Sequence, residues 1–159
     1  MGTLNVTGAG GTAGHPSNGR IPYLVENTID LAQVRSDTGP DQNDVLQCID
    51  IPAETLVMAG GVEVLTALAS SSTLDVGITG VDPDIFVDAH DATSTGYAQF
   101  DTIDSTAMRV IGGTADTLDV KLEGASSATG KIRVWAVLCD ISGIDENDRN
   151  TAAQHDTAS

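Results

Sequence analysis

Apolar and polar residues alternate with a period of two in several short segments of this chain. The clearest segments are residues 73–78, 117–123 and 131–139, where every second residue is Leu, Ile, Val or Ala. Successive side chains of a β-strand point to opposite faces of a sheet, so this pattern predicts strands with one apolar and one polar face. The apolar faces need a common core, and the chain is therefore expected to fold mainly from packed β-sheets.

Further extended segments are expected where apolar residues gather between clusters of turn-forming residues. They are residues 22–31, 45–51, 85–87, 97–100 and 108–111. In residues 45–51, simple alternation places Val45 and Gln47 on the same face as Ile49 and Ile51, with Cys48 opposite.

Two connections in the chain have their own predictions. Residues 124–130, Gly-Ala-Ser-Ser-Ala-Thr-Gly, join the alternating segments 117–123 and 131–139, and a β-hairpin of these two strands is predicted. Residues 55–68 contain a Gly-Gly pair that turns or bulges a strand, and alternation follows it. Their Ala and Leu content leaves a helix open as the alternative for this segment.

These features together predict an all-β protein of one domain. The 159 residues include 17 Gly and only 3% aromatic residues, and no helical segments alternate regularly with the strands. We expect a β-sandwich of jelly-roll type at residues 21–144, with a small barrel as the alternative. Residues 1–20, rich in Gly, Thr and Ser, are expected to form an extended N-terminal arm, and residues 145–159 a polar C-terminal tail.

The charge of the chain limits its partners. Twenty-three acidic residues against seven basic ones give a formal net charge of -16. Such a surface repels phosphate backbones and anionic lipids, so neither nucleic acid nor a membrane is an expected partner. No secretory signal pattern or long apolar stretch is present, which predicts synthesis in a cytoplasm. Cys48 and Cys139 are accordingly expected to be free thiols.

A glycine-rich stretch near the N-terminus has the spacing of a dinucleotide-binding turn. Gly8, Gly10 and Ala13 match that pattern, and Asp30 follows at a suitable distance. A phosphate site of this kind needs a helix that begins in the glycine run, but His15-Pro16 and Asn18-Gly19 break any helix there. The stretch is therefore interpreted as part of the arm, and no cofactor is expected.

Four carboxylates crowd into the segment 82–91, at Asp82, Asp84, Asp88 and Asp91. Carboxylate oxygens are ligands for calcium, which makes these residues weak candidates for a metal site. Their spacing does not follow that of a calcium-binding loop, so an acidic loop without metal is the preferred interpretation. His90 lies among them, but no nucleophile motif accompanies it, and no enzymatic activity is predicted.

Several residues are candidates for protein contacts. Arg133 and Trp135 share one strand face, and Lys121 is expected beside them on a neighbouring strand. Trp and Arg are enriched at interface hot spots, although a Trp packed between two sheets remains the alternative. In the arm, Leu4 and Val6 are candidate apolar anchors that add a strand to the sheet edge of a neighbouring subunit.

Two stretches of the chain resemble a known group of proteins. They are residues 51–93, with "TLDVG" and "DPDIFVDAHDA", and residues 114–142, with "GKIRVWAVLCD". They are similar to small virion structural proteins of marine tailed bacteriophages, including phages of cyanobacteria. Ile78-Thr79-Gly80 stands where that group usually has Gly-Asp-Gly, and the glycine-rich arm is not part of its pattern.

The resemblance implies a non-enzymatic decoration, or cement, protein on the outer capsid surface of a virion. Its partners would be the major capsid protein and other copies of the same chain, typically in a homotrimer. Two other functions stay open at this stage: a receptor- or carbohydrate-binding module at a head or tail fibre, and a calcium-dependent hydrolase or lyase that uses Asp82, Asp84, Asp88 and His90.

Overall fold

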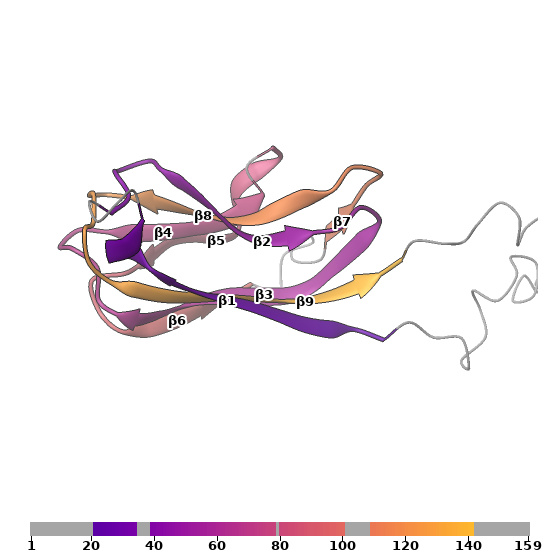
Figure 1. Cartoon of the computed structure of the whole chain (residues 1–159), viewed down its shortest axis with the longest axis horizontal. Coiled ribbons are helices and arrows are strands. Elements are labelled where there is room, and N and C mark those ends of the chain that lie inside the picture. Colours follow the sequence, from indigo (N-terminus) through magenta and orange to yellow (C-terminus); the bar gives the residue numbers. More distant parts are fainter. Residues whose placement is uncertain (1–20, 35–38, 79, 101–108, 142–159) are drawn as a thin grey trace, which may run out of the picture.

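The fold is an all-β sandwich of two antiparallel sheets (Figure 1). The computed structural model describes residues 21–34, 39–78, 80–100 and 109–141. The strands within these ranges are β1 (Tyr23–Asp30), β2 (Val45–Ile51), β3 (Thr55–Thr66), β4 (Thr73–Ile78), β5 (Asp82–Asp91), β6 (Gly96–Gln99), β7 (Arg109–Ile111), β8 (Asp116–Glu123) and β9 (Lys131–Asp140). The predicted arm and tail, residues 1–20 and 145–159, lie outside the described residues.

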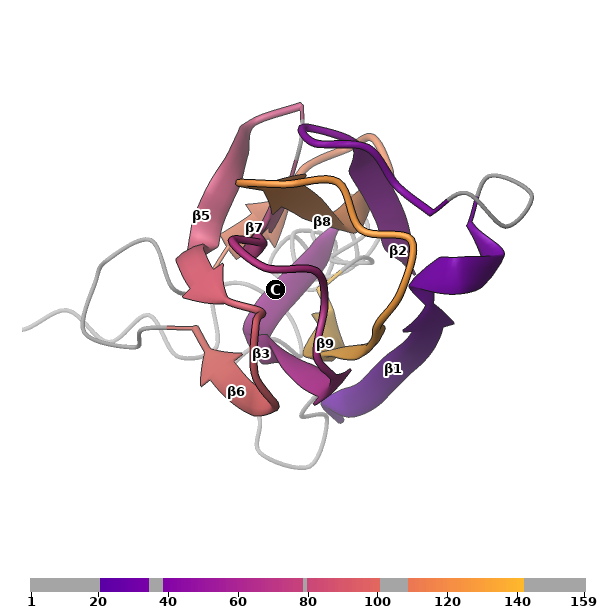
Figure 2. The same ribbon diagram turned by 90° about the vertical axis from the view of Figure 1, so that its left-hand side faces the viewer.

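The strand order is that of a jelly roll. Sheet A has the order β1-β9-β3-β6, with β7 beside the first residues of β3, and sheet B has the order β2-β8-β4-β5. Strands from the two ends of the chain pair in nested fashion, β1 with β9, β2 with β8, β3 with β6 and β4 with β5. Figure 2 shows the two layers end on, with β1 and β2 at one side and β5 and β6 at the other.

The predicted hairpin of residues 117–123 and 131–139 is wrong. Both segments are strands, but β8 belongs to sheet B and β9 to sheet A, so residues 124–130 cross from one sheet to the other. In the nested order each of these strands pairs with partners from elsewhere in the chain. Alternation determines which face of a strand is buried, but it does not determine which strand lies beside it.

The core lies between the two sheets. It is formed by the apolar residues at alternate positions of the central strands, Val57, Val62, Val64, Leu74, Val76, Ile78, Leu118, Val120, Leu122, Ile132, Val134, Ala136 and Leu138. At the β5–β6 side, the ring of Phe86 stacks on that of Phe100 with centroids 4.0 Å apart, which joins sheet B to sheet A. The Phe100 ring occupies the space that a side chain at Gly60 would need.

Residues 45–51 form the predicted strand, but its alternation is interrupted. The pairing with β8 shifts between Gln47 and Ile49, so Cys48 is an extra residue in a β-bulge. Before the bulge Leu46 packs against the core while Val45 and Gln47 are exposed, and after it Ile49 and Ile51 are buried. The prediction that Val45 and Gln47 share a face with Ile49 and Ile51 is therefore wrong.

Both cysteines are buried free thiols, in different sheets. Burial raises the pKa of the Cys48 thiol to about 12, and the nearby negative charge of Asp119 adds to the rise. A thiol with such a pKa stays protonated at neutral pH and is a poor nucleophile.

Residues 55–66 form a strand, so the helix left open for residues 55–68 does not occur. The helical element within the described ranges is one 3-10 turn, Leu31–Gln33, for which Asp30 accepts a hydrogen bond from the Ala32 N–H. None of the described helices is long and apolar enough to cross a membrane.

The strand predicted at residues 85–87 is longer than expected. It begins at Asp82 and ends at Asp91, and its pairing with β4 is interrupted twice by irregular stretches. Near its start, the backbone of Asp82 and Pro83 lies against Gly77 of β4 so closely that a Cβ at Gly77 would overlap it. Gly77 is therefore required by this close approach of two backbones.

We predict that Gly77→Ala lowers the free energy of unfolding by about 1–3 kcal/mol, the usual cost of forcing an atom into a packed site. Gly112→Ala is the matched control, because a Cβ at Gly112 meets no atom within 4 Å and its φ is not positive. Urea unfolding followed by circular dichroism measures both. Equal stability of the two variants would contradict the assigned packing of β5 on β4.

Candidate interaction surfaces

The outer face of sheet A carries Trp135 near its centre, on strand β9. On β9, Lys131, Arg133, Trp135 and Val137 alternate with core residues and so point away from the core. Directly paired residues lie on the same face of a sheet. The register therefore adds Leu24, Glu26, Thr28 and Asp30 from β1, Ala59, Gly61 and Glu63 from β3, and Tyr97 and Gln99 from β6. The alternative of a Trp packed between the two sheets is wrong.

Trp135 has little cover from its cross-strand neighbours. It stands opposite Glu26 on one side and opposite Gly61, which has no side chain, on the other. It is half-buried, whereas Tyr97 is 70% exposed and Leu24 is 62% exposed. Aromatic side chains are enriched at the centres of protein interfaces, so this surface has the composition of a contact site.

The two cations of this face are both paired with carboxylates across strands. The Arg133 Nε donates a hydrogen bond to Glu63 Oε2 at 3.0 Å, and its Nη2 contacts the same oxygen. The hydrogen bond to Glu63 and the charge of Glu63 raise the pKa of Arg133 above its ordinary value. Lys131 Nζ lies 3.6 Å from Asp30 Oδ2. The pairs are solvent-exposed, so they fix side-chain positions more than they stabilise the fold.

Lys121 lies on the other side of the molecule. It belongs to β8 of sheet B and faces outward between Val45 of β2 and Asp75 of β4. The prediction that Lys121 lies beside Arg133 and Trp135 is wrong for the same reason as the hairpin, since β8 and β9 are in different sheets. That Lys121, Arg133 and Trp135 contact a partner stays a prediction. Lys121 lies on the outer face of the opposite sheet, so it would belong to a different contact from Arg133 and Trp135.

The outer face of sheet B is acidic around Lys121. The Lys121 Nζ contacts Glu123 Oε1 and lies 4.0 Å from Asp75 Oδ2, and the hydrogen bond to Glu123 is the main cause of a raised Lys121 pKa. Asp75 is 4% exposed and Asp119, on β8, is 2% exposed. Two carboxylates are therefore buried on a face that normally meets solvent.

The irregular stretch of β5 covers Asp75. Ala89 has a positive φ of 50°, and its N–H donates a hydrogen bond of 2.8 Å to Asp75 Oδ1. Burial raises the pKa of the Asp75 carboxyl above its ordinary value, while the Ala89 N–H opposes the rise. Strand β5 thus shields the carboxylate from water and also provides it with a donor.

The four candidate metal ligands are spread along β5. A side-chain hydrogen bond with Asp82 raises the pKa of Asp84. Asp91 accepts hydrogen bonds from the Thr93 N–H and hydroxyl, and these lower the pKa of Asp91. Asp88 lies between these two pairs in the strand. Among the described residues, no group of three or more His, Cys, Asp or Glu side chains is placed to hold a metal ion.

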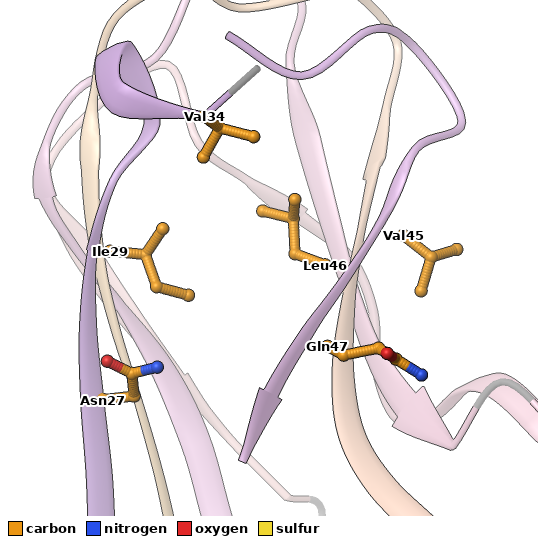
Figure 3. A pocket seen from close by; sticks show the side chains of 6 residues that line it. All are labelled: Asn27, Ile29, Val34, Val45, Leu46 and Gln47. Atoms are coloured by element: carbon orange, nitrogen blue, oxygen red, sulfur yellow. The ribbon is translucent and has the colours of Figure 1, made fainter. Parts of the chain in front are cut away.

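A groove between the free edges of β1 and β2 was not predicted from the sequence. It has a volume of about 480 Å³ and is lined by Asn27, Ile29, Val34, Val45, Leu46 and Gln47. In Figure 3, Ile29, Val34 and Leu46 point into the space between the strands, whereas Val45 and Gln47 point away from it. Apart from Val34, these residues lie in segments that were expected to be strands, but the sequence did not show that the two strands form neighbouring edges.

Leu4 and Val6, the candidate anchors of the arm, lie outside the described residues. Tyr97 and Leu24, in contrast, are on the outer face of sheet A and were not singled out from the sequence. No local pattern marked them, because their place on the same face as Trp135 depends on the pairing of β1 with β9 and of β6 with β3.

Two solved structures of phage capsids contain chains with a similar fold. One belongs to the acid-stable capsid structure of Helicobacter pylori bacteriophage KHP30, with a TM-score of 0.54, 12% identity, and coverage of 75% of this chain and 87% of that one. The other belongs to the capsid asymmetric unit of cyanophage Pam1, with a TM-score of 0.58, 16% identity, and coverage of 77% and 86%. No protein-family model and no curated protein sequence matches the chain. At these identities the likeness shows a shared fold.

The buried carboxyl of Asp75 predicts a dependence of stability on pH. Because its pKa is higher in the folded than in the unfolded protein, the folded state binds the proton more tightly. The stabilising contribution is present below the unfolded pKa and is lost as pH rises through the folded pKa. Asp75→Asn keeps an acceptor for the Ala89 N–H without the charge, so it should be more stable than the native protein at pH 7.

This difference should shrink as the pH falls toward about 4, the ordinary range of a carboxyl group. Thermal unfolding at a series of pH values measures it. Asp50→Asn removes the same charge from an exposed position and is the control. A difference between Asp75→Asn and the native protein that does not change with pH would argue against the assigned burial.

Proposed function

We propose that this chain is a non-enzymatic structural protein of a phage virion that binds the outside of the capsid and stabilises it. The observation that carries the proposal is the jelly-roll sandwich, which is similar over most of its length to chains in two phage capsid structures. The sequence resemblance to virion proteins of marine phages supports it independently. The proposed location is the capsid surface, after synthesis in the cytoplasm of the host.

The outer face of sheet A is the proposed contact with the capsid. It presents Trp135, Tyr97 and Leu24 together, and its cations are already paired with carboxylates of the same face. Such a surface has little net charge to desolvate and exposes Tyr97 and Leu24 beside the half-buried Trp135, which favours a stable contact. The acidic outer face of sheet B, with Asp75, Asp119 and Glu123, would then face the solvent.

The proposed partners are the major capsid protein and other copies of this chain, in a homotrimer. The net charge of -16 supports an external position, because the packaged nucleic acid inside a head would repel it. Weak contacts that repeat by the symmetry of the capsid add up to firm attachment. The protein is therefore expected to bind assembled heads rather than free coat subunits.

Binding to heads tests this function. We predict that the double variant Trp135→Ala/Tyr97→Ala weakens binding to heads stripped of this protein by at least about 30-fold, the effect of losing about 2 kcal/mol at a hot spot. Gln47→Ala changes an exposed residue of sheet B and should bind like the native protein. Co-sedimentation at several protein concentrations gives the affinities.

Unchanged binding of the double variant would contradict the assignment of the contact face. Failure of the native protein to bind any head, together with binding to a glycan array, would instead support the receptor- or carbohydrate-binding module, in which the exposed Tyr97 would stack on a sugar.

A further inference from the structure

The groove between β1 and β2 leaves part of the core accessible. Val25, Ile29, Val34 and Leu46 pack against the core but are only partly buried. The Asn27 Nδ2 donates a hydrogen bond of 2.9 Å to the Cys48 carbonyl, which bridges the two strands beside the groove. Among the strands that the structure describes, β1 pairs with β9 alone and β2 with β8 alone, so each presents a free edge here. A free edge next to partly exposed apolar side chains can accept an extended peptide as an added strand.

We propose that this groove binds the N-terminal arm, residues 1–20, of a second copy of this chain. The arm would lie as an added strand on the edge of β1, with Leu4 and Val6 inserted beside Ile29, Val34 and Leu46. Asn5 and Thr7 alternate with these two residues and would face the solvent. The inference concerns the free protein and does not depend on capsid binding.

Charge favours this segment over the rest of the chain. All 23 acidic residues lie between Glu26 and Asp156, so the arm contains none, and it carries Arg20. The strands that bound the groove contain Glu26, Asp30 and Asp50 and no Lys or Arg. An arm without carboxylates approaches this edge without repulsion. The C-terminal segment 145–159, with four acidic residues and one Arg, would be repelled.

Chain length and proline positions favour a second copy over the arm's own groove. Twenty extended residues span up to about 66–70 Å, more than twice the roughly 27 Å of an eight-residue strand such as β1. An extended arm of this length would be long enough to extend well beyond the edge of its own β1. A hairpin of the arm on its own β1, turning at Asn18-Gly19, would place Pro16 and Pro22 in the paired strands, where each removes a backbone donor.

A pair of arm variants in the full chain tests the proposal without touching the folded domain. We expect Val6→Asp to raise the dissociation constant for self-association at least about tenfold, because it replaces a buried apolar side chain by a charge facing an acidic edge. Thr7→Asp adds the same charge on the opposite face of the strand and should leave self-association unchanged. Sedimentation equilibrium over a concentration series measures both variants. Equal effects of the two, or a native protein that is monomeric at all concentrations, would overturn the proposal.

Cross-linking between copies identifies the groove. Full-length Val6→Cys and Leu46→Cys proteins are mixed under mild oxidation, with the native thiols buried. A covalent dimer that contains one copy of each variant is expected, and Thr7→Cys in place of Val6→Cys should give much less. Far-ultraviolet circular dichroism checks that the Leu46→Cys protein is folded.

The double variant Val6→Cys/Leu46→Cys distinguishes the two origins of the arm. If it forms an internal disulfide in dilute solution and the mixed proteins form no dimer, the arm binds its own groove and the proposal of a second copy is wrong. If neither experiment gives a cross-link, the groove does not bind the arm at all.

Discussion

The packing of two sheets through every second side chain of their strands is the constraint on which the other features depend. Val76, Val120 and Val134, all fully buried, mark the centre of this packing. Burial of these inner faces supplies the main stabilisation and commits the remaining positions to the two outer faces and to the edges. The described part of the chain therefore presents two outer faces of different character to partners, together with the outer edges of β1 and β2.

The two outer faces differ because their charges are arranged differently. On sheet A, Arg133 and Lys131 each pair with a carboxylate of a neighbouring strand. Trp135 follows Arg133 on the same face of β9 and has apolar neighbours on its other side. On sheet B, Lys121 is the one described cation among several carboxylates, and β5 buries Asp75. A balanced aromatic face and an acidic face are consistent with a protein that attaches to a surface on one side and meets solvent on the other.

Alternation predicted the all-β class, most strands and a sandwich with one buried face per sheet, because it is a local property that each strand carries in its own residues. It did not predict strand partners: the hairpin of residues 117–139 failed because β8 and β9 lie in different sheets, and Lys121 was misplaced with it. The bulge at Cys48 and the hydrogen bond from the Ala89 N–H to the buried Asp75 depend on irregularities of the backbone. Such irregularities do not show in the alternation of apolar and polar residues. The groove likewise exists because β1 and β2, although consecutive in the chain, are edge strands of different sheets on the same side of the sandwich.

An electron-microscopy map of the native phage head, at a resolution that shows side chains, tests the central claim most directly. The account predicts density for the jelly-roll domain on the outside of the capsid, with Trp135 and Tyr97 against the coat and the Asp75 side of sheet B toward solvent. Density for the domain inside the shell, or on the outside with the Asp75 face against the coat, would contradict it.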